Sequence, residues 1–136
     1  MFYSIFDKDE VEKNRLPKTI LIVDDTKDVR ELLHFILAQQ GYAIVEASDG
    51  EEAIKVARQE KPDLILMDFS LPVMDGLTAT RIIKESEDFT DIPVICVTAH
   101  GSWVRQQALE AGCVDVIAKP VEFQQLTSLV SKYLRV

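Results

Sequence analysis

Asp68 closes an apolar run, and its position is the most informative feature of the sequence. The run Asp63-Leu-Ile-Leu-Met-Asp68 predicts a short buried strand, so Asp68 stands where the strand ends. A carboxylate in such a place does not serve solubility. It can instead act as a nucleophile toward phosphorus and become an acyl phosphate.

Three other apolar runs also end in side chains that can do chemistry. Asp24 and Asp25 follow Ile-Leu-Ile-Val, Thr98 follows Pro-Val-Ile-Cys-Val, and Lys119 follows Val-Asp-Val-Ile-Ala. In an open parallel sheet, ligands bind outside the carboxyl ends of the strands. If the four ends meet there, one pocket holds three carboxylates, a hydroxyl and an ammonium.

This set of groups favours a cation and a phosphoryl group. Carboxylates held close together raise each other's pKa, so the cluster of Asp24, Asp25 and Asp68 requires positive charge. Carboxylates with water and phosphate oxygens are ligands that Mg²⁺ accepts. Lys119 adds a point charge and Thr98 a hydroxyl donor. Together they form a clamp for a phosphoryl group in transfer, whose charge lies on its outer oxygens.

The elements that position these residues alternate regularly. Strand and helix patterns alternate five times, which predicts βαβ units and a doubly wound parallel sheet covered on both faces. Ser48 with Glu51 predicts a capping box, and residues 85–91 predict an acidic surface loop. Residues 1–17 are predicted to be an N-terminal extension and residues 18–136 the domain. The predicted strands are 19–23, 43–47, 63–68, 93–97 and 114–118. The first predicted helix carries its apolar residues over 29–37 and ends at Gly41, and the others open at Ser48 and near 77, 102 and 122.

Composition narrows the class of protein. The chain has 136 residues, of which 47% are hydrophobic and 28% charged, an ordinary globular balance. A net charge of −8 argues against binding nucleic acid or an anionic membrane surface. Cys96 and Cys113 match no zinc spacing and predict reduced, buried thiols in a cytoplasmic protein. The sequence contains no apolar run long enough for a membrane span and no signal peptide.

Taken together, these motifs resemble the receiver domain of two-component response regulators. The resemblance is carried by Ile-Leu-Ile-Val-Asp24-Asp25, Leu-Ile-Leu-Met-Asp68 with Leu71-Pro-Val-Met-Asp-Gly76, Val97-Thr98-Ala99 and Lys119-Pro120. It implies a flavodoxin-like five-stranded parallel sheet in the order 2-1-3-4-5 with five helices. It also implies a cis peptide bond between Lys119 and Pro120.

The resemblance assigns a role to each pocket residue. Asp68 accepts a phosphoryl group from a histidine kinase or a phosphotransfer protein. Asp25, Asp68 and the backbone carbonyl of Ser70 bind Mg²⁺, and Asp24 binds it largely through water. Thr98 donates a hydrogen bond to the phosphoryl group and Lys119 pairs with it.

The same resemblance predicts a signalling switch. The chain would catalyse only its own phosphotransfer and dephosphorylation. The face formed by residues 102–111, 114–118 and 122–134 would change its affinity for a protein partner that the sequence does not identify.

Two positions depart from the family pattern. The aromatic that usually stands three residues before the lysine is Val116 here, and a valine has a stiff χ1 and no ring to rotate. This puts the usual aromatic switch in doubt. Ser70, two residues after Asp68, is small, and we hypothesise that it leaves room for an attacking water and so affects dephosphorylation.

Two other functions fit parts of the pattern. A phosphohydrolase of the haloacid dehalogenase type would need a second aspartate where Ser70 stands. A binding module that no longer uses phosphate would not need every pocket residue. Among the other side chains, His34 is predicted to be solvated and His100 to lie near the pocket mouth, while Trp103 is either a partner anchor or a half-packed side chain.

Overall fold

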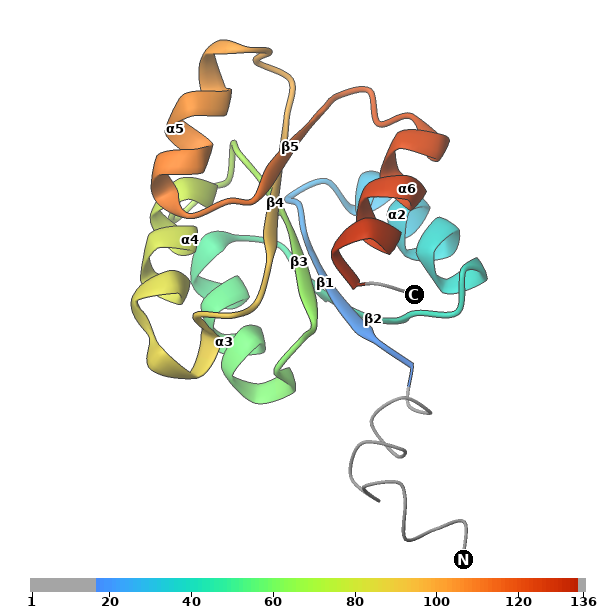
Figure 1. Ribbon diagram of the computed structural model, residues 1–136, viewed down its shortest axis with the longest axis horizontal. Coiled ribbons are helices and arrows are strands. Elements are labelled where there is room, and N and C mark those ends of the chain that lie inside the picture. The colour runs from blue at the N-terminus through green and yellow to red at the C-terminus, as the bar shows by residue number, and fades with distance from the viewer. Residues whose placement is uncertain (1–16, 135–136) are drawn as a thin grey trace, which may run out of the picture.

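Five parallel strands form the centre of the protein in the order β2-β1-β3-β4-β5 in the computed structural model, which describes residues 17–134 (Figure 1). This confirms the predicted flavodoxin-like order. Of the predicted extension over residues 1–17, all but Pro17 lies outside the described residues. In chain order the elements are β1 (Thr19–Val23), α2 (Lys27–Gln39), β2 (Ala43–Ala47), α3 (Gly50–Glu60), β3 (Leu64–Asp68), α4 (Gly76–Glu85), the 3₁₀ helix η2 (Glu87–Phe89), β4 (Val94–Thr98), α5 (Trp103–Ala111), β5 (Asp115–Ala118) and α6 (Phe123–Leu134).

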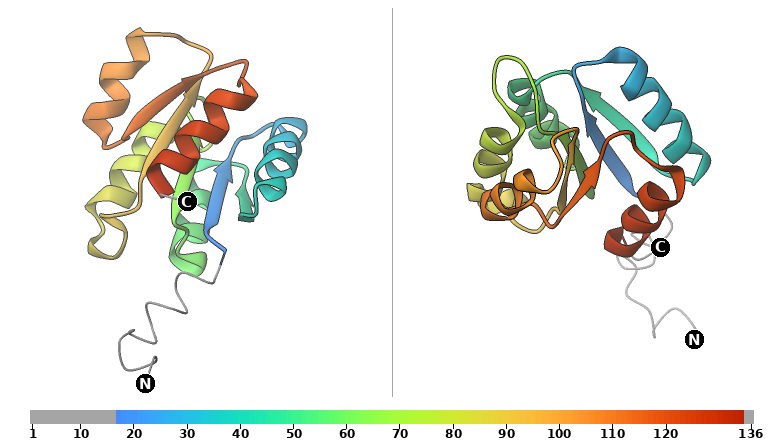
Figure 2. Two further views of the ribbon diagram at one scale, coloured as in Figure 1. Left: turned by 45° about the vertical axis from the view of Figure 1, so that its right-hand side comes forward. Right: turned by 90° about the horizontal axis from the view of Figure 1, so that it is seen from above.

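The sheet divides the core into two apolar layers. Side chains of β1 alternate between them, so Leu21 and Val23 pack with α3, α4 and α5, while Ile20 and Ile22 pack with α2 and α6. Figure 2 shows the two helix layers on opposite sides of the sheet. Every residue of β3 and β4 is buried, which explains why these strands have no polar alternation.

The order of the strands creates the place for a site. From β1 the chain crosses to β2 on one side and then returns to β3 on the other, so the connections diverge between β1 and β3. At such a switch point the loops at the carboxyl ends separate and leave a crevice. No helix within residues 17–134 is long and apolar enough to cross a membrane.

The start of α3 differs from the prediction by one residue. Asp49 is the N-cap, because its extended backbone turns its carboxylate toward the backbone N–H of Glu52, which donates to it at 2.8 Å. Ser48 lies one position earlier, and its hydroxyl donates to the Glu52 side chain at 3.1 Å. The predicted capping box from Ser48 to Glu51 is therefore wrong, although the helix it was meant to begin is present.

The predicted acidic loop over residues 85–91 is only partly a loop. Glu85 ends α4, and η2 follows with Phe89 buried in the core. Burying Phe89 anchors this connection, and Lys84 reaches across it to donate to the carbonyls of Thr90 and Ile92. The charged residues of this stretch obscured the structural role of Phe89.

Asp75 caps α4 and is expected to contribute to stability. Its carboxylate accepts from the backbone N–H groups of Leu77 and Thr78, at 3.0 and 2.9 Å, and from the Thr78 hydroxyl. Replacing Asp75 with alanine should lower the free energy of unfolding by about 1–2 kcal/mol, measured by urea denaturation. Ser102→Ala is the matched control, because Ser102 is the N-cap of α5 but makes no side-chain cap bond. Equal losses in both variants would contradict the capping role.

Candidate phosphoacceptor site

The predicted site residues meet at the carboxyl edge of the sheet. The parallel register places Asp24 and Asp68 at the same level, since the residues before them are paired. Thr98 lies one residue beyond the partner of Asp68, and Lys119 one residue beyond the partner of Thr98. From β3 to β4 to β5, each site residue therefore lies one position further toward the carboxyl edge than the one before it. We call this arrangement the stepped register of the site.

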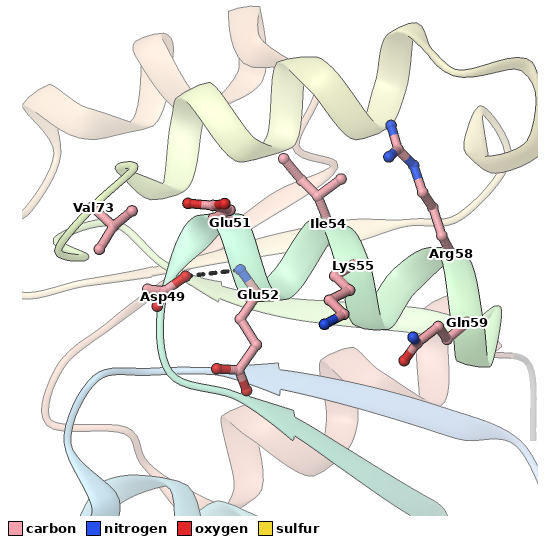
Figure 3. Close-up of a pocket in the computed structure, with 8 residues that line it drawn as sticks. All are labelled: Asp49, Glu51, Glu52, Ile54, Lys55, Arg58, Gln59 and Val73. Atoms are coloured by element: carbon pink, nitrogen blue, oxygen red, sulfur yellow. Dashed lines mark hydrogen bonds between the residues drawn. The ribbon is translucent and has the colours of Figure 1, made fainter.

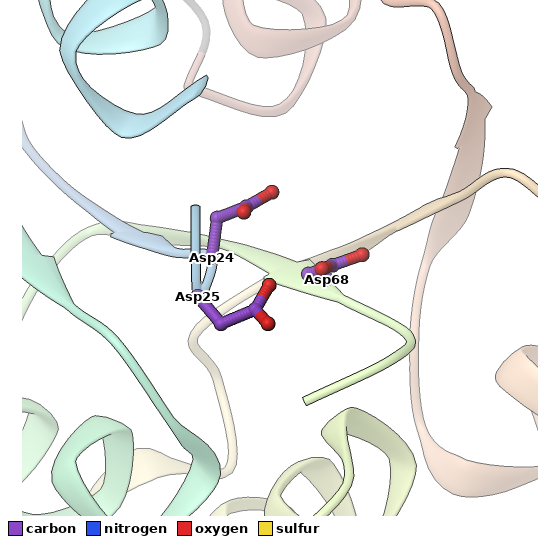
Figure 4. Close-up of side chains that lie close together, drawn as sticks. All are labelled: Asp24, Asp25 and Asp68. Atoms are coloured by element: carbon purple, nitrogen blue, oxygen red, sulfur yellow. The ribbon is translucent and has the colours of Figure 1, made fainter. Parts of the chain in front are cut away.

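The three carboxylates form one cluster. Asp24 and Asp68 are only 2% and 4% exposed, whereas Asp25 is open to solvent. One oxygen of each carboxylate lies within 4.8 Å of the others, and Figure 4 shows the three groups converging from the ends of β1 and β3. Hard oxygen donors of this number and charge, with one side open, fit Mg²⁺, which keeps several waters when it binds proteins.

Lys119 joins the two buried carboxylates. Its Nζ lies 3.1 Å from Oδ2 of Asp24 and 3.2 Å from Oδ1 of Asp68, and its side chain is 26% exposed. Burial alone would lower the pKa of Lys119, but the hydrogen bond to Asp24 and the charges of both carboxylates outweigh it and raise the pKa. The ammonium therefore stays charged throughout the neutral range.

Asp68 has the opposite balance. Burial raises its pKa first, the charge of Asp24 raises it further, and the ion pair with Lys119 offsets these effects only in part. The same contact thus favours charge on Lys119 without fully stabilising charge on Asp68, because burial and the carboxylate of Asp24 both oppose charge on Asp68, whereas Asp24 favours charge on Lys119. The site holds more negative charge than its single ammonium neutralises, which favours binding of a further cation.

Thr98 is the last residue of β4, and Ser70 lies in the loop after β3. Thr98 is buried, its hydroxyl oxygen accepts from the His100 backbone N–H at 2.9 Å, and its carbonyl accepts from the Lys119 backbone N–H at 2.7 Å. Ser70 is exposed in the loop after β3, with its hydroxyl oxygen 3.4 Å from Nε2 of His100. His100 therefore lies at the mouth of the pocket, as predicted, and the Lys119–Pro120 bond is cis, also as predicted.

The structure reveals two supporting contacts that the sequence did not indicate. Arg30 donates from Nη1 to the Asp24 carbonyl at 2.7 Å and from Nε to Glu46 at 3.1 Å. Gly76 packs directly on the Asp68 carbonyl, leaving no space for a Cβ. The sequence motifs do not predict either contact, because both depend on how neighbouring elements pack in three dimensions.

His34 is partly exposed to solvent, as predicted, and it also has a charged partner. Its Nδ1 lies 2.7 Å from Oε2 of Glu46, the same carboxylate that Arg30 contacts. Burial raises the pKa of Glu46, but the hydrogen bonds to His34 and Arg30 outweigh burial and lower it. Two residues of α2, Arg30 and His34, are thus tied to Glu46 on β2.

A separate groove of about 660 Å³ runs along the outer face of α3 (Figure 3). It contains none of the predicted site residues. Its charged side chains are three acidic residues at the start of α3 and two basic residues further along the helix, and they do not converge on one point. The groove therefore lacks the chemistry of the strand ends. Its lining is Asp49, Glu51, Glu52, Ile54, Lys55, Arg58, Gln59 and Val73.

Removing the charge of Asp68 is expected to stabilise the protein at neutral pH. Because the pKa of Asp68 is raised, the folded chain binds this proton more tightly than the unfolded chain, so the charged form costs stability above that pKa. In divalent-free buffer at pH 7, Asp68→Asn should melt higher than the native chain, by about 4 °C for each kcal/mol relieved. The difference should shrink as pH falls toward the ordinary aspartate range.

The exposed Asp28 supplies the control for this experiment. Asp28→Asn should leave the melting temperature nearly unchanged, both at pH 7 and at a pH in the ordinary aspartate range. A stability difference between Asp68→Asn and the native chain that did not vary with pH would show that the raised pKa is not its cause.

Comparisons with known proteins agree with this geometry. The model of the response regulator receiver domain matches residues 20–131. The polar-differentiation response regulator DivK of Brucella anthropi is 33% identical over 88% of this chain and 98% of its own. The phosphate regulon transcriptional regulatory protein PhoB of Pseudomonas aeruginosa is 40% identical over 87% of this chain, which spans 52% of that protein.

A solved structure shares both the fold and part of the sequence. The receiver domain of a sensor histidine kinase from Pseudomonas aeruginosa, with a magnesium ion coordinated in its active site cleft, matches with a TM-score of 0.82 and 32% identity. The match covers 89% of this chain and all of that one. On its motifs, strand order, pocket and relatives, the chain belongs to the response regulator receiver domain family.

Proposed function

We propose that Asp68 accepts a phosphoryl group from a phosphohistidine of a histidine kinase or phosphotransfer protein. One observation carries the proposal: Asp68 is buried at the end of β3, among like charges and against the ammonium of Lys119. An Asp68 carboxylate oxygen attacks phosphorus, a P–O bond forms and the P–N bond breaks. The electron pair of that bond stays on the imidazole nitrogen of the donor.

The residues around Asp68 would each serve this transfer. Lys119 stabilises charge on the phosphoryl oxygens, and the Thr98 hydroxyl donates to one of them. Asp24, Asp25, Asp68 and the Ser70 carbonyl would hold Mg²⁺, which when bound supplies the positive charge that draws the phosphoryl oxygens and the carboxylate together. The magnesium ion in the cleft of the related receiver supports this assignment.

The chain would act as a switch rather than as an enzyme on other substrates. It would catalyse only its own phosphorylation and dephosphorylation, in the cytoplasm, where free thiols such as Cys96 and Cys113 stay reduced. A phosphohydrolase mechanism is less well supported, because Ser70 stands where that chemistry needs a second carboxylate. The relative DivK is a response regulator, which favours a role as a switch.

The output surface is proposed to be the face of α5, β5 and α6. Three large apolar side chains on its two helices are exposed, namely Trp103, Leu109 and Phe123. Phosphorylation would alter the affinity of this face for a protein partner, which requires that the partner distinguish the two states. The partner is expected to be a protein rather than nucleic acid or membrane, in keeping with the net charge of −8.

Mass spectrometry of the intact chain tests the proposal. Incubation with Mg²⁺ and acetyl phosphate should add one phosphoryl group, and chelating Mg²⁺ should prevent the addition. Asp68→Asn should lose it, whereas Asp28→Asn should retain it as a matched control with an exposed carboxylate. No gain in the native chain, or an undiminished gain in Asp68→Asn, would sink the proposal.

Ser70 is expected to influence how long the phosphoryl group persists. Its small exposed side chain leaves the approach to Asp68 open to water. Ser70→Arg should lengthen the lifetime of phospho-Asp68 by about threefold or more, which corresponds to about 0.6 kcal/mol in the barrier. The decay of the phosphorylated mass after the donor is removed measures this lifetime, and an unchanged lifetime would exclude the idea.

A further inference from the structure

Three aromatic rings form a cluster at the rim of the pocket. Phe69 directly follows Asp68, His100 lies two residues after Thr98, and Trp103 begins α5. The ring centroids are 5.6 Å apart for Phe69 and His100, 5.8 Å for His100 and Trp103, and 6.1 Å for Phe69 and Trp103. All three pairs meet edge to face, a favoured geometry for aromatic pairs.

The cluster is attached to the pocket at two points. Phe69 is bonded to the phosphoacceptor residue through the backbone. His100 is held to Thr98 by its backbone N–H, which donates to the Thr98 hydroxyl oxygen at 2.9 Å. A phosphoryl group on Asp68 would offer the Thr98 hydroxyl a new acceptor, and a β-branched side chain that turns toward it moves between discrete χ1 positions. Reorientation therefore changes the bond that positions His100.

The segment between His100 and α5 can follow such a change. Gly101 has a φ of +72°, and no other atom lies within 4 Å of where its Cβ would be. Ser102 provides no side-chain cap, and the first backbone bonds of α5 are long, at 3.4 Å from Val104 to Gly101. Val104 itself is fully buried, so α5 remains anchored one residue after Trp103.

Trp103 is placed to carry the change to the surface. Its side chain is 59% exposed, so contacts with Phe69 and His100 rather than a closed core fix its position. Val116, the residue that stands where the family has its aromatic, is half-buried on β5 and pairs with Cys96 in the register. The pocket thus has no ring on β5, and has one on α5 instead.

We propose that His100 is a positioning residue that couples the state of Thr98 to Trp103, so that Trp103 reports phosphorylation in place of the missing aromatic at Val116. The proposal rests on phosphorylation of Asp68 as the switching event. In the unphosphorylated chain the ring of His100 holds Trp103 against Phe69. Phosphorylation releases or shifts this contact, and the exposed indole changes position at the start of α5.

Tryptophan fluorescence tests the coupling directly, because Trp103 is the only tryptophan in the chain. The full chain is treated with Mg²⁺ and acetyl phosphate, and emission is followed in parallel with intact mass. Emission should change with the same time course as the phosphoryl gain. In His100→Ala the mass gain should persist. The emission change should be about threefold smaller, because Phe69 and Trp103 each lose their contact with the His100 ring.

The second histidine provides the matched control. His34 pairs with Glu46 on another part of the molecule, so His34→Ala should retain the full emission change. A mass gain without an emission change, or an emission change of full size in His100→Ala, would overturn the coupling while leaving phosphorylation of Asp68 intact. Absence of the mass gain itself would overturn the proposed function, and the coupling with it.

Discussion

Replacing Lys119 with alanine is expected to slow phosphoryl uptake by Asp68 by about 10²-fold, the typical loss when one preorganised donor to a developing anion is removed. Lys119 is the only cation among the described residues that contacts both Asp24 and Asp68. Since its pKa is raised, it supplies full charge at any pH near neutrality. Without it, no cation among the described residues forms an ion pair with the buried carboxylates that the incoming phosphoryl group meets.

The rate of mass gain with Mg²⁺ and acetyl phosphate measures this effect. Lys132→Ala is the matched control, because Lys132 is exposed on α6 and lies over the ring of Tyr133 rather than at the pocket. Its uptake rate should equal that of the native chain. If Lys119→Ala also kept a rate within about threefold of native, less than ~0.7 kcal/mol of barrier, the charge clamp would be wrong.

Gly76→Ala is expected to lower the free energy of unfolding by about 3 kcal/mol, near the upper end for inserting a methyl group into a filled space. A Cβ at this position would overlap the backbone carbonyl of Asp68, and would also approach the Met67 side chain at 3.1 Å. Alanine favours a helix over glycine by about 1 kcal/mol, but the overlap is with rigid backbone, so the clash prevails.

Chemical denaturation of Gly76→Ala tests this expectation, and Gly101→Ala is the contrasting control. Gly101 has open space around its Cβ position but a φ of +72°, so alanine there should cost only about 1 kcal/mol through backbone strain. If Gly76→Ala were no less stable than Gly101→Ala, the close approach of α4 to β3 would not be a constraint. Gly76→Ala should also slow phosphoryl uptake, because the clash would displace the backbone of Asp68.

The fold was largely predictable because its signals are local. Buried parallel strands require continuous apolar runs, and each of the five runs in this chain proved to be a strand. The helices followed from apolar spacing, and their ends differ from expectation by about one residue. The N-cap of α3 was misplaced because Ser48 and Asp49 are both good caps, and only the backbone conformation of Asp49 decides between them.

The pocket was predictable for a different reason. Strand ends in a parallel sheet must share one edge, so the polar residues at the ends of four of the five apolar runs mark the site without knowledge of the strand order. Contacts that arise from packing between elements could not be found in this way. The bond from Arg30 to the Asp24 carbonyl, the pair of His34 with Glu46, and the burial of Phe89 all depend on packing that no spacing in the sequence encodes.

The stepped register of the site limits where the sequence can tolerate insertions and deletions. Each residue along a strand advances about 3.3 Å and turns its side chain to the other face of the sheet. A single deletion within β3 or β4 would therefore withdraw Asp68 or Thr98 from the pocket and turn it toward a helix layer. The lengths of β1, β3, β4 and β5 are thus as much a part of the site as the side chains at their ends.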